Sequence, residues 1–228
     1  TVTLTGVQDV IDDDNQTSTI TVSINQSSTL DDNYDSVVSK NVSFTTIDDE
    51  SAPLVTLAAS SDSIAENGSG SVTLTATMTV ASSSDTTITL SLSGTATQST
   101  DYSLANGSIV ISAGQTTGTD TITVVNDSIV EASQTIIVDI SVSGSTAGES
   151  ETQQVTVTIT DDDSAAVTIE DVNVNEGSNA GLTLTLNNEV EGGFTIDATA
   201  YPINGSGTAT GGTSDSGNTD FIEKTESI

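Results

Sequence analysis

Acidic side chains offer most of the chemistry that this sequence can carry. The chain of 228 residues has 33 Asp and Glu against 2 Lys and Arg, which gives a formal charge of −31 at pH 7. Several of the acids stand in runs, such as Asp12-Asp13-Asp14 and Asp161-Asp162-Asp163. Carboxylate oxygens bind hard cations, but an acidic run is also common in a solvated turn. A cation is favoured here because the acids recur at equivalent places along the chain.

The residues that are missing exclude several classes of protein. The sequence has no His, Cys or Trp, and its two bases are Lys40 and Lys224. It therefore offers no Cys/His zinc site, no haem or iron–sulfur ligation, no thiol nucleophile and no Ser-His-Asp triad. A field this negative repels nucleic acid and anionic lipid. We expect neither as a partner, and we expect no membrane insertion, because no apolar run approaches the roughly 20 residues of a span.

Catalysis by paired carboxylates is the remaining enzymatic possibility. A glycosidase would use two such acids, but these enzymes usually line their clefts with aromatic residues, and this chain is only 3% aromatic. Many acids crowded together favour binding a cation over raising the pKa of a single catalytic acid. We therefore expect that the protein is not an enzyme.

Alternating residues predict the short strands that would position the acids. Thr, a β-branched residue, alternates with Val, Ile and Leu. The alternating runs lie at 71–80, 86–94, 107–114, 119–125, 135–144 and 154–160. Gly, Asn, Asp and Ser separate the runs, and no window has helical spacing. Strands this short at such regular intervals indicate an all-β protein built as a sandwich.

Internal repetition predicts a tandem array. Residues 154–169 resemble residues 41–57 with a spacing of 161 − 48 = 113, and residues 119–135 resemble residues 1–17 with a spacing of 119 − 1 = 118. Repeats of this kind are units that stack along one chain. The position of the repeat along the sequence divides the chain into three parts. They are the second half of a unit at 1–51, a complete unit at 52–164, and the first half of a unit at 165–228.

The two half-units predict a longer assembly. Either the sequence is an excerpt of a longer repetitive polypeptide, or half-units on neighbouring chains complete one another. Each half alone would expose an apolar face and strand edges. We therefore expect neighbouring units as partners, in the same chain or in adjacent subunits, and head-to-tail docking between subunits would give a homopolymeric filament.

The complete unit carries motifs that identify a family. In order they are Ile64–Gly68, Gly94–Thr97, Thr100–Tyr102, Ile109–Thr116, Val125–Glu131 and Ile159–Asp163. This succession resembles the Calx-beta domain family, known from the regulatory region of the sodium/calcium exchanger, from an integrin tail and from long bacterial surface proteins. The resemblance implies that each unit is a seven-stranded immunoglobulin-like sandwich with Ca²⁺ bound at one end.

The resemblance also implies the calcium ligands, residue by residue. In the middle unit they are Glu66, Asp101, Asp127, the backbone carbonyl of Ile129, Glu131, Asp161, Asp162 and Asp163. The first half-unit offers Asp9, Asp13, Asp48, Asp49 and Glu50, and the last half-unit offers Glu176 and Asp220. Amides replace acids of calcium-binding members at Asn126 and Gln134, and at Gln8 and Gln16 in the first half-unit. We therefore expect fewer or more weakly bound ions.

Two functions are compatible with these features. The first is a structural array outside a bacterial cell, in a surface adhesin stalk, filament or matrix protein, with Ca²⁺ stiffening the joints between units. The run Asp161–Asp163 ends one unit only a few residues before the next begins, so an ion held there would leave little slack. The alternative is a calcium-sensing regulatory module attached to another domain.

Overall fold

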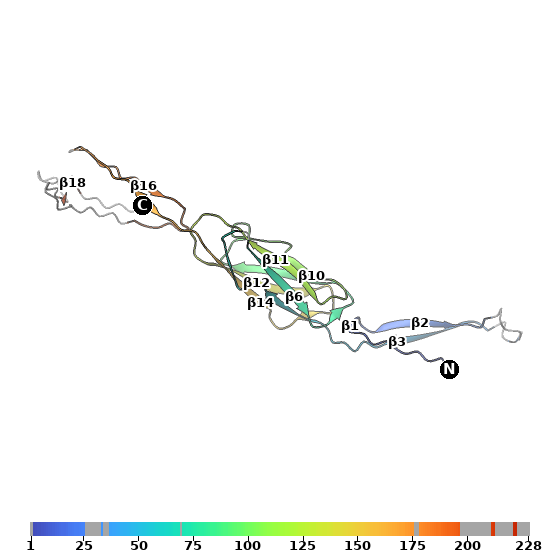
Figure 1. Ribbon diagram of the computed structural model, residues 1–228. Coiled ribbons are helices and arrows are strands. Elements are labelled where there is room, and N and C mark those ends of the chain that lie inside the picture. Colours follow the sequence, from blue (N-terminus) through green and yellow to red (C-terminus); the bar gives the residue numbers. More distant parts are fainter. Residues whose placement is uncertain are drawn as a thin grey trace. The chain divides into compact units, whose positions relative to one another are not determined.

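A computed structural model describes residues 2–25, 33, 37–68, 70–175 and 178–196, together with the backbone of 211–212 and 221–222. The regular elements in this part of the chain are β-strands (Figure 1). Within it there is no helix with the length and apolar character needed to cross a membrane. By their contacts the residues form two units, the first Thr1–Val125 with Gln134–Thr160 and the second Asn126–Ser133 with Asp161–Ile228.

The first unit contains a sandwich of two five-stranded sheets. One sheet has the strand order β13-β4-β6-β11-β9 and the other β10-β8-β12-β14-β5. The strands of the first sheet are β4 (Leu54–Ala59), β6 (Ser71–Met78), β9 (Tyr102–Leu104), β11 (Thr117–Val124) and β13 (Gly148–Glu149). Those of the second are β5 (Ser63–Ala65), β8 (Thr86–Gly94), β10 (Ser108–Ile111), β12 (Gln134–Ser143) and β14 (Gln154–Thr160). Every predicted run from 71 to 160 thus contains a strand.

Seven strand-forming segments give these strands, because three of the segments are interrupted and pass from one sheet to the other. The interrupted segments are β4 with β5, β9 with β10, and β13 with β14, and each has one member in each sheet. The other four, β6, β8, β11 and β12, are continuous. The expected seven-stranded all-β sandwich is confirmed, with three of its strands divided between the sheets.

Polar side chains hold two of these crossings. Between β9 and β10, the buried carboxylate of Asp120 accepts hydrogen bonds from the backbone N–H of Asn106 at 3.2 Å and of Gly107 at 3.0 Å, and from Nδ2 of Asn106 at 3.1 Å. Between β4 and β5, the hydroxyl of Ser60 accepts from the N–H of Thr73 at 3.0 Å. These bonds replace the ladder bonds that the chain loses where it leaves a sheet.

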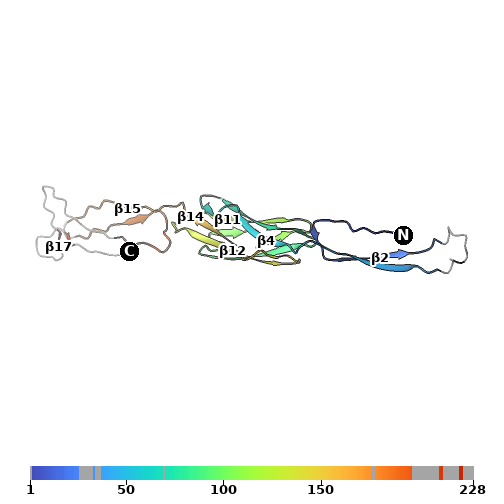
Figure 2. The ribbon, with the colours of Figure 1, turned by 90° about the horizontal axis from the view of Figure 1, so that it is seen from below.

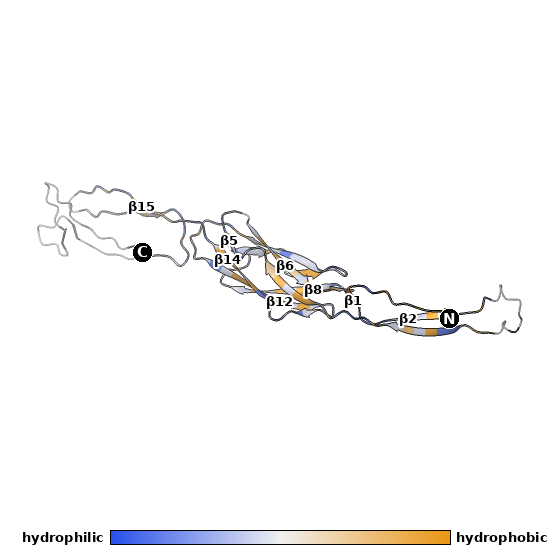
Figure 3. Ribbon diagram, turned by 60° about the horizontal axis from the view of Figure 1, so that its bottom comes forward, coloured by the Kyte–Doolittle hydropathy of each residue, from blue (hydrophilic) through white to orange (hydrophobic). Residues whose placement is uncertain are grey.

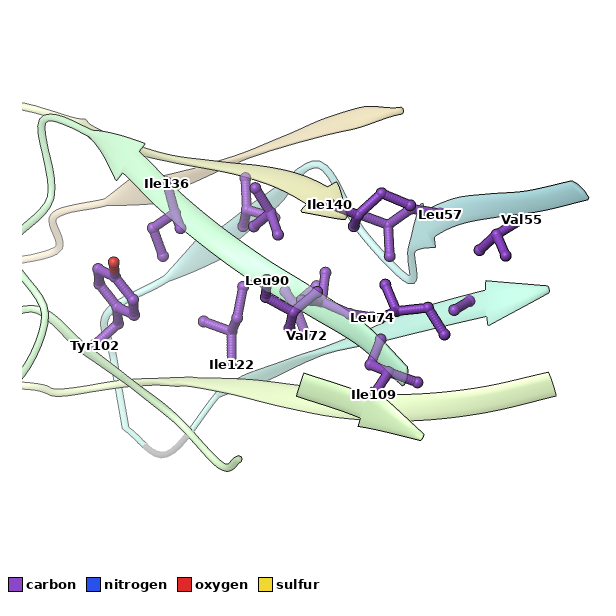
Figure 4. Close-up of a cluster of buried hydrophobic side chains, with 14 of the residues drawn as sticks. Val55, Leu57, Val72, Leu74, Leu90, Tyr102, Ile109, Ile122, Ile136 and Ile140 are labelled. Carbon is purple, nitrogen blue, oxygen red and sulfur yellow. The ribbon is translucent and has the colours of Figure 1, made fainter. Parts of the chain in front are cut away.

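The core lies between the two sheets and follows the period of two (Figure 4). Along β6 every second side chain is buried, including Val72 and Leu74. Ile122 lies beside Val72 in the same sheet, Ile109 and Ile136 belong to the other sheet, and all three are fully buried. Each such side chain contributes about 1.5–3 kcal/mol through burial. In Figure 3 the hydrophobic colour accordingly marks stretches of β6 and β8.

Gly94 ends β8 in a conformation that needs glycine. Its φ is 118°, and a Cβ at this position would lie 2.1 Å from the backbone oxygen of Thr135. A side chain would therefore break the close approach of β8 to β12. This turn begins the loop that leads to Asp101, so the glycine fixes where one of the predicted ligands stands.

Among the described residues, four further strand pairs do not belong to the two five-stranded sheets. In the first unit, β1 (Ile11–Asp12) pairs with β7 (Ala81–Ser82), and β2 (Gln16–Val22) pairs antiparallel with β3 (Lys40–Thr46) to form the blue ribbon of Figure 2. In the second unit, β15 (Val167–Ile169) pairs with β16 (Leu184–Leu186), and β17 (Gly211–Gly212) with β18 (Phe221–Ile222). These strands leave large apolar side chains such as Val42 and Ile169 exposed. The division at 1–51, 52–164 and 165–228 stays a prediction.

Candidate cation-binding groups

Five acids lie around the base of the β2–β3 ribbon, and we name them the N-terminal acidic group. Its members are Asp9, Asp13, Asp48, Asp49 and Glu50. The register pairs Gln16 with Thr46, so the segment before β2 and the segment after β3 leave the ribbon at the same end. The five acids line one hollow of about 350 Å³. Residues separated by some 35 to 41 positions in the sequence are thus brought together around this hollow.

Amide groups satisfy part of the N-terminal acidic group. Nε2 of Gln8 donates to Oδ1 of Asp49 at 2.7 Å and to Oε1 of Glu50 at 3.3 Å. The backbone N–H of Asp13 donates to Oδ1 of Asp48 at 3.4 Å. An amide donor therefore stabilises some of the carboxylate oxygens by hydrogen bonding, without any cation.

Partial burial and repulsion between the acids of this group raise the pKa of two of its carboxyl groups. Partial burial and the charges of Asp9 and Asp48 raise the pKa of Asp13 above its ordinary value. Partial burial and the charge of Asp49 raise the pKa of Glu50. A cation bound between these carboxylates would remove the repulsion that causes both shifts.

A second set of acids, the central acidic group, belongs to the second unit. Its members are Asp127, Glu131, Asp161, Asp162 and Asp163. The run of three follows β14 directly, and Asp127 follows the end of β11. Partial burial raises the pKa of Asp163, and the charges of Asp161, Asp162 and Asp127 add to the shift. Asp127 and the acidic run are therefore close enough for their charges to interact.

Two carboxylate oxygens of the central acidic group are buried and have no hydrogen-bond partner within the described residues. They are Oδ1 of Asp161 and Oδ2 of Asp163, and the side-chain oxygen of Gln134 at the start of β12 is in the same condition. Burying a polar oxygen without a partner is costly, so such atoms call for a bound ion or an ordered water. Hard oxygens are the ligands that Ca²⁺ takes. The residues fit calcium in two respects: their donor atoms are hard oxygens, and some of these oxygens are buried without a hydrogen bond in the described part of the chain.

Ile129 and Glu131 lie close to Asp127 in the loop that follows β11. The backbone N–H of Ile129 donates to Oδ1 of Asp127 at 2.7 Å. Both Ile129 and Glu131 are half-buried. The loop is therefore held in place by the same carboxylate that the sequence predicts as a ligand.

Glu66 and Asp101 are the predicted ligands on the sandwich itself, and both are buried, with 3% and 7% of their surface exposed. Glu66 directly follows β5, and its N–H donates to the carbonyl oxygen of Thr160 at 3.0 Å. Oδ2 of Asp101 accepts from the N–H of Thr97 at 2.6 Å, so this carboxylate caps its own turn. Buried carboxylates need compensation, and the whole chain supplies only two basic residues.

The ligand assignment nevertheless stays a prediction. Among the residues that the structure describes, no three acidic side chains stand as a group able to hold a metal ion. A calcium shell would therefore include amide and backbone carbonyl oxygens as well as carboxylates, which Ca²⁺ accepts. Glu176 and Asp220 lie outside the described residues.

Two acids have roles that the sequence did not reveal. Asp120 sits within the alternating run of β11 and holds the crossing described above. Asp12, in an acidic run that could be a solvated turn, has only 7% of its surface exposed and accepts a hydrogen bond from the hydroxyl of Thr146. In both cases the signal was a polar residue at an inward position of a strand.

With this geometry in hand, the family of the chain can be stated. The profile of the Calx-beta domain family matches residues 48–163, about half of the chain. The chain therefore belongs to the Calx-beta domain family. No curated protein sequence matches it.

Solved structures with a similar fold include two Calx proteins and one surface layer protein. The apo-form Calx CBD1 domain is 19% identical with a TM-score of 0.41, and the match covers 48% of this chain and 99% of that domain. CBD12 from CALX1.2 is 22% identical with a TM-score of 0.38, covering 46% of this chain and 45% of that one. Domains 4–9 of surface layer protein SbsC are 15% identical with a TM-score of 0.28, covering 72% and 28%.

Proposed function

We propose that this chain binds Ca²⁺ through its acidic groups and that the bound ions stiffen successive repeats of an extracellular bacterial array, as in a surface adhesin stalk, filament or matrix protein. The partners of each unit are neighbouring Calx-beta units, in the same chain or in adjacent subunits. The proposal includes no catalytic role. Calx-beta domains are binding and regulatory domains, and they are calcium-binding modules in sodium/calcium exchangers.

The observation that carries the proposal is the pair of buried oxygens on Asp161 and Asp163 that have no hydrogen-bond partner among the residues that the structure describes. These atoms lie beside the charge of Asp127, which adds to the raised pKa of Asp163. An uncompensated set of acids destabilises the folded chain, because like charges repel and buried oxygens lose water. A bound divalent cation would reduce the repulsion between the carboxylates and would also coordinate the buried oxygens.

Ca²⁺ would be held by carboxylate oxygens of the central acidic group, completed by backbone carbonyl and amide oxygens of the same loops, because no three described acidic side chains stand as a group able to hold a metal ion. The carboxylates would come from Asp127, Glu131 and Asp161–Asp163. The ion supplies positive charge that neutralises the carboxylates and fixes the loops that bear them. The N-terminal acidic group would bind a second ion through carboxylate oxygens of Asp9, Asp13 or Asp48, completed by amide and backbone carbonyl oxygens. These assignments use the residues that the two groups bring together and leave Glu66 and Asp101 as predicted ligands from the sandwich.

The array role is supported by the connection between β14 and β15. β14 ends at Thr160 and β15 begins at Val167, so the connection has 167 − 160 − 1 = 6 residues, three of them the acids Asp161–Asp163. A link this short is not a free coil. An ion bound there restricts it further, which favours a spacer with stiff joints. The polar composition with 3% aromatic residues suits a long exposed stalk.

Thermal unfolding of the 228-residue chain tests the calcium part of the proposal. A ligand that binds only the folded state stabilises it by about 2.7 kcal/mol at a hundredfold excess over Kd. The melting temperature should therefore rise in millimolar Ca²⁺ relative to chelator. Mg²⁺ at the same concentration is the control for screening of the −31 charge. Equal melting curves in Ca²⁺, Mg²⁺ and chelator would contradict the proposal.

Small-angle scattering tests the mechanical part. Restricted joints should give a narrower distribution of shapes in Ca²⁺ than in chelator. If Ca²⁺ raises the melting temperature but leaves the scattering profile unchanged, the ion does not stiffen the joints. That outcome favours the regulatory module over the stalk.

A further inference from the structure

A two-residue parallel bridge joins β1 to β7 in the first unit. Ile11 pairs with Ala81, and Asp12 pairs with Ser82. The N–H of Ser83 donates to the carbonyl oxygen of Asp12 at 3.1 Å. Asp12, Ala81 and Ser82 are all buried, so the bridge is part of the packed structure and not a surface contact.

A second bridge of the same kind occurs in the second unit. Val130 pairs with Val190 in parallel. The N–H of Val130 donates to the carbonyl oxygen of Glu189 at 2.8 Å, and the N–H of Glu191 donates to the carbonyl oxygen of Val130 at 3.0 Å. Val130 thus exchanges hydrogen bonds with the residues on either side of its partner, as parallel strands do.

The two bridges occupy equivalent places in the sequence repeat on the loop side, and similar places relative to the preceding strand on the other side. On the loop side, 130 − 12 = 118, the spacing that relates residues 119–135 to residues 1–17. On the strand side, Ser82 lies four residues after the end of β6 (82 − 78) and Val190 four residues after the end of β16 (190 − 186). The N–H donors to the loop, on Ser83 and Glu191, each follow by one residue. The same contact therefore recurs with the same register.

The loops that carry the bridges also have the same local fold. The N–H of Ile11 donates to Oδ1 of Asp9 at 2.9 Å, and the N–H of Ile129 donates to Oδ1 of Asp127 at 2.7 Å. In each loop an Asp carboxylate fixes the residue directly before the bridging one. This places the carbonyl of the next residue for pairing.

Side chains at the bridges do not match, whereas the main-chain groups do. Asp12 corresponds to Val130, and Ser82 corresponds to Val190. A contact that survives such changes is made by N–H and C=O groups, as in strand addition, where main-chain bonds give affinity and side chains adjust. The sequence repeat therefore preserves the pairing without preserving the residues that pair.

We propose that this acidic loop is a docking element between repeats. In each repeat, the residues equivalent to Ile11–Asp12 bind the segment equivalent to Ala81–Ser82 of the following repeat through parallel main-chain pairing. The partner is thus a second Calx-beta repeat of this sequence type. The register of the junction is set by main-chain hydrogen bonds and does not depend on which cation the neighbouring acids hold.

Disulfide trapping tests the docking element, because the sequence has no cysteine. Two double variants of the 228-residue chain place cysteines at paired positions, Val130→Cys with Val190→Cys and Asp12→Cys with Ser82→Cys. Neighbouring strands lie about 4.8 Å apart, within the span of a disulfide. Oxidised glutathione is added in millimolar Ca²⁺, and cross-linked peptides are measured by mass spectrometry. Both pairs should close at least about tenfold faster than the control, because a fixed pair has a high effective concentration.

The control variant keeps Val130→Cys and moves the second cysteine to Leu182, which is exposed on the same segment. The reduced variants are compared with the wild type by circular dichroism. Equal rates for the bridge pairs and the control would overturn the proposal. Cross-linking of only one bridge pair would overturn the claim that the contact recurs.

Hydrogen exchange of the wild-type chain provides a measurement that needs no substitution. The amides of Ser83 and Glu191 donate in the two bridges and should exchange at least about tenfold more slowly than the same amides in unstructured peptides. Exchange of both amides at the unstructured rate would contradict the docking element, even if a variant failed to fold.

Discussion

The N-terminal and central acidic groups share one sequence pattern but differ in what their oxygens contact. In the first, Gln8 donates its amide to Asp49 and Glu50. Its counterpart in the repeat, Asn126, is one methylene shorter and donates to the backbone carbonyl of Asp127 at 3.0 Å. In the described part of the chain, one oxygen each of Asp161 and Asp163 is buried without a hydrogen-bond donor. Two groups with the same pattern of acids can therefore differ in how strongly they favour a bound cation. The difference depends on which carboxylate oxygens already accept a hydrogen bond from a neighbouring amide.

The largest expected effect comes from removing the acids with unpartnered oxygens. The double variant Asp161→Asn with Asp163→Asn should weaken Ca²⁺ binding by roughly tenfold or more, since affinity follows the number of ligand charges. The matched double variant in the N-terminal acidic group, Asp48→Asn with Glu50→Gln, removes the same charge and should weaken overall binding less. Calcium titrations followed by melting temperature compare the two. Equal losses would remove the distinction between the groups.

A smaller effect is expected from converting the amide donor of the N-terminal acidic group into an acid. Gln8→Glu removes the hydrogen bonds to Asp49 and Glu50 and adds a charge beside them. The variant should melt at a lower temperature than the wild type in chelator and gain several-fold in Ca²⁺ affinity. Gln115→Glu adds the same charge at an exposed turn elsewhere and is the control. If both variants behave alike, Gln8 does not limit cation binding.

The smallest expected effect is a dependence of stability on pH in chelator. The folded chain raises the pKa values of Asp13, Glu50 and Asp163, so it binds protons more tightly than the unfolded chain. This contribution to stability is fully present below the unfolded pKa, about 3.9 for Asp, and is lost as the pH rises through the folded pKa. Urea unfolding at several pH values should show stability rising as the pH falls from neutral.

Asp163→Asn should reduce that rise, because Asn imitates the protonated acid at every pH. Asp62→Asn, at an exposed position outside both acidic groups, removes the same charge and should leave the rise nearly unchanged. In Ca²⁺ the sign reverses, since protons then compete with the ion for the carboxylates. A rise in stability on acidification in the presence of Ca²⁺, as large as in chelator, would contradict the assignment of these acids to binding.

Much of the sandwich could be predicted because its strands obey a period of two. The run 154–160 coincides with β14, and residues 86–94 coincide with β8. The crossings between sheets could not be predicted, because they depend on buried bonds such as those of Asp120, whose carboxylate resembles any other acid in the sequence. The period of two places Asp120 on the buried face of β11 with Ile122 and Val124, but it does not show which backbone groups the carboxylate will bind.

For the candidate site, the sequence indicated which acids lie near one another. It did not indicate which of their oxygens are hydrogen-bonded. The repeat brings Asp48 and Asp13 together, and likewise Asp163 and Asp127. Whether their oxygens are satisfied depends on single amide donors such as Gln8, whose hydrogen bonds to Asp49 and Glu50 the sequence does not show. The main-chain bridges were not foreseen, because pairing of N–H and C=O groups leaves no residue signature.

Direct titration of Ca²⁺ into the chelator-treated chain by calorimetry tests the central claim most directly. We predict saturable binding that Mg²⁺ at equal concentration does not reproduce and that Asp161→Asn with Asp163→Asn largely abolishes at the stronger site. The absence of saturable binding up to about 10 mM Ca²⁺, above the range of extracellular modules, would contradict the account, as would unchanged binding in the double variant.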